Sequence, residues 1–293
     1  MSKPFHSGPM GRVPSLIAAF LLVGAASAQV LPAYALFNAN GKKISHKKFL
    51  RTVSDADVVL FGEQHNNPIA HWLELVVAQE LAARGPLVMG AEMIEADDQT
   101  VLDRYLRGEI DQAAFDTLAC LWPNHATDYA ALVDLAKEKN LPFIATNVPR
   151  RYARAVSRGG FEALDTVPPA ERAWMASLPI PFDPNLPGYM KMLTMLGDHG
   201  TPDVVKAQAL KDATMAYFIA QNAKKGSRFL NFNGSFHSDF HEGIAWYLKQ
   251  AHPEWKVMTI ATVIPEQLDR LDAEFRGQAD IILCVDEDIP GSD

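Results

Sequence analysis

The chain has 293 residues, of which 48% are hydrophobic and 21% are charged, and its formal net charge is −8. This length fits one large domain or a core domain with an insert, and the hydrophobic content is enough for a substantial core. The composition excludes a fibrous or intrinsically disordered protein. The negative charge argues against nucleic acid as a partner, because phosphate binding needs a basic face.

The N-terminal segment has the three parts of a secretory signal. Lys3 and Arg12 give it a positive start, residues 16–23 are a short hydrophobic run, and residues 26–28 (Ala-Ser-Ala) form a small-residue cleavage site. We expect cleavage after Ala28, which leaves 25 basic and 35 acidic side chains and a charge of −10. No cysteine stands near this site to carry a lipid anchor, and no other run reaches the length of a membrane span.

The first predicted elements are a hairpin and a short helix at an edge of the fold, before the first core strand. Residues 33–37 alternate like a strand and lead to an Asn-Gly pair at 40–41, which is a strong hairpin signal, so residues 42–45 are expected to be the return strand. A short helix is predicted at 46–54. The hydrophobic run at 58–61 is then the first buried core strand.

The end of this first core strand carries two ionisable residues. Gly62 allows a tight turn, and Glu63 and His65 follow it just before a predicted helix at 68–84. In open α/β sheets, ligands bind outside the carboxyl ends of the strands. Taken alone, His65 and Asn66 fit equally well as caps of the next helix.

Strands and helices alternate along the rest of the chain. Further strands are predicted at 87–92, 142–147, 228–233, 256–263 and 281–285. Further helices are predicted at 97–107, 111–118, 125–139, from 150 onward, at 203–224 and up to about 250. This alternation is typical of an α/β fold with a mostly parallel β-sheet and helices on both faces. The acidic end, 286–293, is expected to be solvated and mobile.

Residues 151–200 differ from the rest of the chain. They contain six prolines and four methionines and lack strand-like runs, so we expect a smaller helical subdomain inserted between core segments at 29–150 and 201–293. A methionine-rich helical surface adapts to a flat apolar ligand. Ordinary irregular core packing explains this composition equally well.

The chain has two cysteines, Cys120 and Cys284, both in hydrophobic surroundings in the sequence. We expect two buried thiols rather than a disulfide.

Four predicted strands end in polar side chains, and in a parallel sheet these ends lie at one edge. Such ends often carry unrelated helix caps, but four in one sheet favour a common site. The residues concerned are Glu63 with His65, Glu92, Asn147 with Arg150, and His237.

Several stretches between residues 57 and 263 also match one known family. They are Gly-Glu-x-His at 62–65, Gly-Ala-Glu at 90–92, Leu-Pro-Phe-Ile-Ala-Thr-Asn-Val-Pro-Arg at 141–150, Gln-Ala-Leu-Lys-Asp-Ala-Thr-Met-Ala at 208–216 and Asn-Gly-Ser-Phe-His at 233–237. Together they resemble the ChaN-like haem-binding lipoproteins of bacteria, within the superfamily that includes Tiki metalloproteases and erythromycin esterases.

The resemblance implies a parallel α/β core with a smaller helical domain. It implies a periplasmic protein of haem and iron uptake, with haem held through a tyrosine oxygen at a homodimer interface and with membrane uptake components as further partners. Two features depart from the family. The lipid-anchor cysteine is missing, which favours a soluble periplasmic form. One extra residue precedes His237 in a segment that is usually Gly-x-Gly-His.

Haem needs an apolar slot, an axial ligand and polar or cationic groups for its propionates. Tyr189 is the first ligand candidate, because a phenolate suits ferric iron, and His199 is the second, as a ligand or as a partner of the tyrosine. Met192 belongs to the same segment. Arg150 and its neighbouring arginines, with Asn147, are candidates for the propionates. The reserve ligands are Tyr152 and Tyr217.

The alternative function is a metal-dependent peptidase or esterase. Glu63, His65, Glu92 and His237 form an oxygen and nitrogen set that suits Mn²⁺, Co²⁺ or Zn²⁺, which would activate water. Without metal, His65 would act as a base held by Glu92. The same residues also fit a structural polar network in a binding protein that is not an enzyme. His71, in the following helix, is interpreted as an ordinary helix-face residue.

Overall fold

A seven-stranded β-sheet lies at the centre of the chain from Pro32 onward, which folds as one unit. The computed structural model describes residues 1, 2, 4 and 32–292. Apart from three N-terminal positions, the expected secretory signal and its cleavage site lie outside the described residues, and export stays a prediction.

The sheet is mostly parallel, as the sequence predicts. The strand order is β1-β7-β6-β2-β5-β3-β4, and every neighbouring pair is parallel except β1 with β7. Each of the core strands β2 to β7 ends within three residues of its predicted bounds. The strands are β1 (Tyr34–Asn38), β2 (Val58–Glu63), β3 (Leu87–Glu95), β4 (Phe143–Asn147), β5 (Arg228–Gly234), β6 (Val257–Val263) and β7 (Ile281–Val285).

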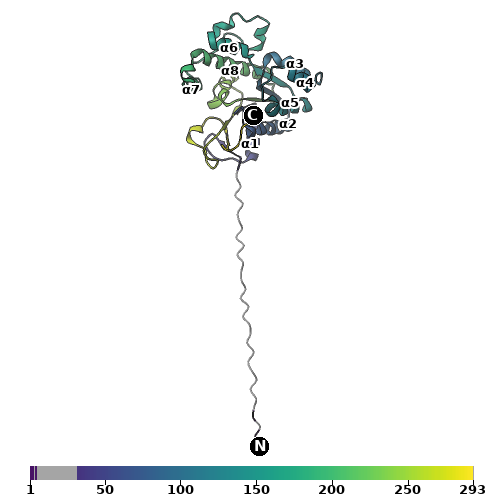
Figure 1. Cartoon of the computed structure of the whole chain (residues 1–293), viewed down its shortest axis with the longest axis vertical. Helices are drawn as coiled ribbons and strands as arrows, with labels where there is room; N and C mark the ends of the chain where they lie inside the picture. The colour runs from purple at the N-terminus through teal and green to yellow at the C-terminus, as the bar shows by residue number, and fades with distance from the viewer. Residues whose placement is uncertain (3, 5–31, 293) are drawn as a thin grey trace. The chain divides into compact units, whose positions relative to one another are not determined.

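Helices cover both faces of this sheet, with α2 to α5 on one side and α6 to α8 on the other (Figure 1). The helix predicted at 125–139 begins late, because residues 125–129 form a π-helical turn labelled η2. The α-helices are α1 (His46–Val53), α2 (Pro68–Arg84), α3 (Gln99–Leu106), α4 (Gln112–Leu118), α5 (Ala130–Lys139), α6 (Arg150–Gly159), α7 (Pro187–Leu196), α8 (Pro202–Asn222) and α9 (Ile244–Ala251).

Strand β2 shows how the two hydrophobic cores arise. Successive side chains of a strand point to opposite faces of the sheet. Val59 and Phe61 therefore pack in the core under α1 to α5, while Val58 and Leu60 pack in the core under α6, α8 and α9. Because both faces are buried, the strand reads as a continuous hydrophobic run.

The N-terminal cap of α2 is Asn67, and not His65 or Asn66. The Asn67 side chain caps the helix by accepting hydrogen bonds from the backbone N–H groups of Ile69 (3.1 Å) and Ala70 (3.0 Å), and Pro68 occupies the first helical turn. His65 and Asn66 are therefore not the caps, and His65 is available to the strand-end site.

The hairpin expected after β1 is wrong. Residues 42–45 form no strand, and Phe37 and Lys43 share one isolated bridge. All five residues of β1 pair with β7 instead. The Asn-Gly turn is nevertheless present, with Gly41 at a φ of +81°, and it directs the chain into α1.

Two smaller expectations also need correction. Both cysteines are free, as expected, and Cys284 is buried, but Cys120 is exposed because it follows the end of α4 at the surface. The C-terminal tail is not simply solvated. Ser292 donates its N–H to the Asn66 carbonyl oxygen and its hydroxyl to the Asp128 carboxylate, both at 2.8 Å.

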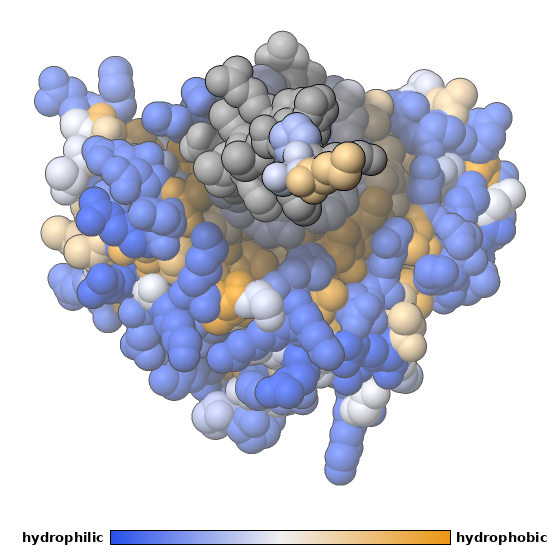
Figure 2. All heavy atoms as spheres, turned by 90° about the horizontal axis from the view of Figure 1, so that it is seen from below, coloured by the Kyte–Doolittle hydropathy of each residue, from blue (hydrophilic) through white to orange (hydrophobic). Residues whose placement is uncertain are grey.

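Residues 151–200 are free of strands, as expected, and contain most of α6, all of α7 and three short 3₁₀ helices. Their separation from the core as a subdomain stays a prediction. Among the described residues, no helix is both long and hydrophobic enough to span a membrane. The face of the molecule in Figure 2 is mainly hydrophilic, with hydrophobic residues in patches between the polar ones.

Candidate functional site

The carboxyl ends of β2, β5 and β3 bring four of the six predicted strand-end residues together around Gly234, namely Glu63, His65, Glu92 and His237. Glu63 pairs in register with Gly234, whose N–H donates to Glu92 Oε2 at 2.9 Å. A Cβ at position 234 would lie 2.8 Å from His65 Nε2. The absence of a side chain there leaves room for His65 and Glu92 to lie close to the backbone of this residue.

Glu63 anchors one half of the site. It is 1% exposed, and its Oε1 accepts hydrogen bonds from the Tyr129 hydroxyl at 2.8 Å and from His65 Nδ1 at 2.7 Å. Its Oε2 lies 3.1 Å from His71 Nδ1. Burial would raise the pKa of Glu63, but the interactions with His65 and His71 outweigh it and lower the pKa to about 2. The carboxylate therefore holds His65, whose side chain is 44% exposed, at the open side of the site.

His71 belongs to this half, although the sequence suggests an ordinary helix-face residue. It is 8% exposed, and its Nδ1 lies 3.3 Å from Glu74 Oε2 as well as beside Glu63. Its Nε2 faces the backbone oxygen of His65 at 3.3 Å and Asp128 Oδ2 at 3.6 Å. Burial disfavours the imidazolium, but the hydrogen bonds and charges of Glu63 and Glu74 raise the pKa of His71 to about 10.

Glu92 and His237 form the other half. His237 Nε2 lies 3.0 Å from Glu92 Oε1, and His237 Nδ1 lies 2.5 Å from Asp212 Oδ1. The Tyr189 hydroxyl donates to the second oxygen of Asp212 at 2.9 Å. Both ring nitrogens of His237 are therefore engaged by carboxylates, in a hydrogen-bonded chain that runs from Tyr189 to Glu92.

The charges of this half support one another. Burial disfavours the charged forms, but the two carboxylates raise the pKa of His237 to about 9. The charges of His237 and Lys211 hold the pKa of Glu92 well below its usual range, against the effect of burial. The pKa of Asp212 is raised, because its burial outweighs the effect of His237. Asp212 was not predicted as a site residue, although it lies in the Asp-Ala-Thr-Met-Ala run that carries the family resemblance.

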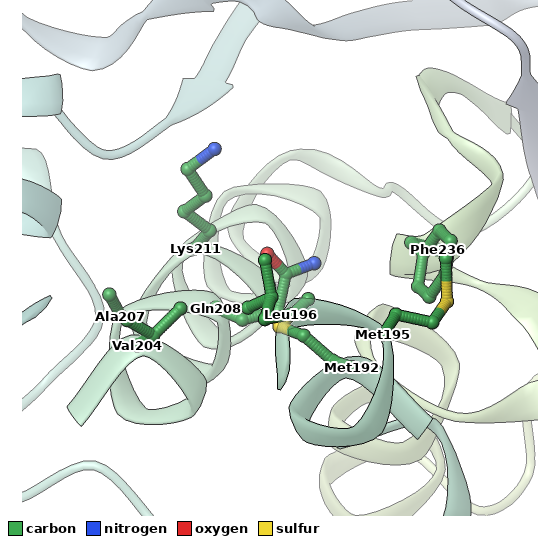
Figure 3. Close-up of a pocket in the computed structure, with 8 residues that line it drawn as sticks. All are labelled: Met192, Met195, Leu196, Val204, Ala207, Gln208, Lys211 and Phe236. Carbon is green, nitrogen blue, oxygen red and sulfur yellow. The ribbon is translucent and has the colours of Figure 1, made fainter. Parts of the chain in front are cut away.

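Two pockets open beside this network, and Lys211 lines both. One is a hydrophobic pocket of about 420 Å³ between α7, α8 and the short helix η6 (Ser235–His237). Figure 3 shows Lys211 extending from α8 away from the methionines of α7. The lining residues are Met192, Met195, Leu196, Val204, Ala207, Gln208, Lys211 and Phe236.

The second pocket is more polar and measures about 320 Å³. Asn147 and Arg150 line it, as do Arg154 and Trp122. Asn147 donates its side-chain N–H to the backbone oxygen of Glu92 at 3.0 Å, which ties β4 to β3. The Arg150 Nε donates to Glu95 Oε1 at 2.6 Å, and both residues line the pocket.

The five predicted haem residues do not meet in one cavity. Met192 lines the hydrophobic pocket, and Asn147 and Arg150 line the polar one. Tyr189 is 4% exposed and lines a small cavity next to the hydrophobic pocket; burial and the Asp212 charge raise the pKa of its hydroxyl. His199 is exposed, at the end of the short helix that follows α7. The roles of all five stay predictions.

The predicted metal set also differs from the donors that the fold places closest together. Among residues 32–292, the structure has one group of three donors whose ligand atoms lie within 4.8 Å of one another, namely Glu63, His71 and Glu74. Only Glu63 is shared with the predicted set. His71 and Glu74 have the i, i+3 spacing of one helix face in α2, which is the signal that sequence reasoning missed.

Comparison with solved structures supports the fold. The chain is similar to ChaN of Campylobacter jejuni, a structure titled for cofacial haem binding, with a TM-score of 0.66 and 16% identity over 85% of this chain and 96% of that one. It is also similar to a succinoglycan biosynthesis protein, with a TM-score of 0.51 and 12% identity over 82% of this chain and 90% of that one. A Bacillus cereus protein matches with the same identity and coverages and a TM-score of 0.50. At such low identity these likenesses show the fold alone.

No curated protein matches this sequence. A family model described as "Haem-binding uptake, Tiki superfamily, ChaN" matches residues 49–248, which is more than half of the chain. This match confirms the resemblance given by the sequence motifs, and the α/β fold agrees with it. The chain therefore belongs to the ChaN family of haem-binding uptake proteins, within the Tiki superfamily.

Proposed function

We propose that this protein binds haem in the hydrophobic pocket between α7, α8 and η6 and acts in bacterial haem or iron uptake as an exported, periplasmic protein. The observation that carries the proposal is the pocket itself, an open and almost wholly hydrophobic hollow of about 420 Å³ with one cationic residue, Lys211, at its edge. Membership of a haem-binding family supports the ligand.

The lining suits a porphyrin. Met192, Met195 and Phe236 offer polarisable, adaptable side chains to a flat hydrophobic ring. The propionates need cations, and Lys211 leads from this pocket to the polar one, where Arg150 and Arg154 stand. Haem would thus place its hydrophobic face on α7 and its carboxylates toward α6.

We propose Tyr189 as the axial ligand and His199 as the alternative. Tyr189 lines the small cavity next to the hydrophobic pocket. The two cavities have Met192, Gln208 and Phe236 in common. Its hydroxyl now donates to Asp212, so ligation to iron would require it to leave this bond and lose its proton. His199 is exposed and needs no such release.

We also propose a homodimer that closes over the pocket. Several large hydrophobic residues are exposed around it, which favours a covered surface. Membrane components of haem uptake would be further partners. The exposed hydrophobic residues of the pocket lining are Met195, Leu196 and Phe236.

Ferric haem titration of the mature protein, followed by absorption spectroscopy, tests the proposal. We expect a spectrum different from that of free haem, lost in Tyr189→Phe and kept in His199→Ala. Tyr34→Phe, in the distant strand β1, is the matched control and should bind like the wild type. A free-haem spectrum with the wild-type protein would refute haem binding, and loss in His199→Ala alone would reassign the ligand.

The metal-dependent hydrolase is supported less well by the predicted residues. Among residues 32–292, the donor atoms of the predicted metal set do not converge within 4.8 Å of one another, and His237 is held between Glu92 and Asp212. The side chain of His65 is 44% exposed, and its Nε2 lies beside Gly234. Hydrolysis of peptide or ester substrates by the metal-loaded protein would support this alternative function.

A further inference from the structure

A buried cluster beneath the strand ends lies outside the proposed haem pocket. It consists of Glu63 at the end of β2 and of His71 and Glu74 in α2. Their relative exposures are 1%, 8% and 0%. One donor atom from each lies within 4.8 Å of the other two. The three side chains thus converge from two elements on one enclosed point.

One carboxylate oxygen in this cluster, Glu74 Oε1, has no hydrogen-bond partner, and Glu63 Oε2 has only His71 Nδ1 beside it at 3.1 Å. Both oxygens are inaccessible to solvent. Buried polar atoms are almost always hydrogen-bonded, because an unsatisfied one costs about 1–3 kcal/mol. Glu63 Oε1, by contrast, accepts from both Tyr129 and His65. An unpartnered oxygen on a fully buried carboxylate favours a further ligand at this cluster.

The charges of the cluster also point to a missing cation. Three carboxylates, of Glu63, Glu74 and Asp128, surround the single imidazole of His71. Within the described part of the chain, no lysine or arginine lies within 4.0 Å of Glu63 or Glu74. Buried charge needs compensation. The other half of the site is different, since Glu92 has Lys211 at 3.7 Å in addition to a histidine.

The spacing of the donors fits a coordination sphere. Metal bonds of about 2.0–2.2 Å place neighbouring ligand atoms roughly 3–3.5 Å apart. His71 Nδ1 lies 3.1 Å from Glu63 Oε2 and 3.3 Å from Glu74 Oε2. These distances allow one ion to contact all three side chains after small rotations.

The surroundings of His71 are those of a metal-ligating histidine. Such a histidine usually gives its second ring N–H to a backbone carbonyl or a carboxylate, which fixes its tautomer. His71 Nε2 faces the backbone oxygen of His65 at 3.3 Å and Asp128 Oδ2 at 3.6 Å, which leaves Nδ1 for the cluster. Tyr129 in turn holds Glu63.

From this convergence we propose that Glu63, His71 and Glu74 bind one divalent first-row transition metal, with Mn²⁺ and Zn²⁺ as the natural probes. Two carboxylates and one imidazole suit both ions. The ion would join β2 to α2 and fix Glu63, which orients His65 at the open side of the site. This site is separate from the hydrophobic pocket, and it does not depend on haem binding.

The test measures metal on the mature, tag-free protein without haem. Protein stripped with a chelator is exposed to Zn²⁺ or Mn²⁺ and desalted, and its metal content and melting temperature are measured. We expect about one equivalent of metal and a higher melting temperature in the wild type. Glu74→Gln keeps the shape of the side chain and should weaken binding by at least about tenfold, judging from the effect of lost coordination partners.

Two further variants make the result decisive. Glu80→Gln changes a half-buried surface position of the same helix, paired with Arg84 and outside the cluster, and should bind metal like the wild type. Glu92→Gln removes a carboxylate of the other half and should also retain metal. Failure of the wild type to hold metal, or loss in Glu92→Gln but not in Glu74→Gln, overturns the proposed site. A stable Glu74→Gln protein that still binds metal overturns it equally.

Discussion

At the scale of single residues, the site depends on the lack of a side chain at Gly234, which leaves space for His65. The position lies between His65 and Glu92, and its own N–H is bound by Glu92. The glycine has an ordinary φ of −59°, so its requirement is one of space rather than of backbone conformation. Any side chain would meet the imidazole ring.

Replacement of this glycine provides a direct prediction. In Gly234→Ala the new Cβ would stand 2.8 Å from His65 Nε2, so the ring must move. We expect a loss of about 1–3 kcal/mol in the free energy of unfolding, as is typical of overpacking. Urea denaturation measures it. Gly159→Ala, where the nearest atom is 3.9 Å away, is the control and should cost nothing; an equal loss in both would contradict the packing argument.

The residues that sequence reasoning missed share a physical reason. Glu63, His65, Glu92 and His237 were recognisable because each follows a strand or a glycine turn at a known edge of the sheet. His71, Glu74 and Asp212 lie in the middle of helices, where a polar residue normally faces solvent. Only the packing of α2 and α8 against the strand ends turns them inward, and that packing is tertiary information.

At the scale of elements, the strands and helices were largely predictable. Doubly buried strands are hydrophobic throughout, and several helices, among them α2 and α8, begin at a capping side chain followed by proline. The predictions failed where contacts between residues far apart in the sequence determine the local structure. Strand β1 pairs along its whole length with β7, almost 250 residues away, and forms only one isolated bridge with the residues after its own turn. Likewise, residues 125–129 wind as a π-helical turn that places Tyr129 against Glu63.

Helix α7 carries a prediction about the hydrophobic pocket. Met195 lines the pocket and is 63% exposed, so Met195→Glu should fold normally while placing a charge on the surface proposed for haem. Burying a carboxylate under a hydrophobic ring is unfavourable. We expect haem affinity to fall by about tenfold or more, which corresponds to about 1.4 kcal/mol.

The neighbouring methionine is a matched control for this change. Met190 belongs to the same helix and is 50% exposed, but it does not line the pocket. Met190→Glu should therefore leave the haem titration unchanged if haem enters the pocket of a single chain. Equal losses in both variants would place haem on the wider surface of α7 instead.

At the scale of the whole molecule, the buried network makes stability depend on pH. His237 lies between Glu92 and Asp212, next to Lys211 and the Tyr189 hydroxyl, and its pKa is raised from 6.5 to about 9. A raised histidine pKa stabilises the fold fully below the unfolded value of about 6.5, and this stability is lost as the pH rises toward 9. The lowered pKa of Glu92 acts on the other side, and its stabilisation is lost as the pH falls below about 4.5.

The free energy of unfolding should therefore be greatest between about pH 4.5 and 6.5 and should fall as the pH rises to 9. The raised pKa of Asp212 lowers the free energy of unfolding as the pH rises above the unfolded value of 3.8, because ionising this buried carboxyl in the folded state is costly. Chemical denaturation at a series of pH values measures the profile. His237→Gln should reduce the alkaline slope, whereas His199→Gln, at an exposed position, should preserve it. A profile that stays flat from pH 6.5 to 9 in the wild type would contradict the raised pKa of His237. It would mean that His237 is neutral in the folded protein and that its proton resides on Glu92 or Asp212.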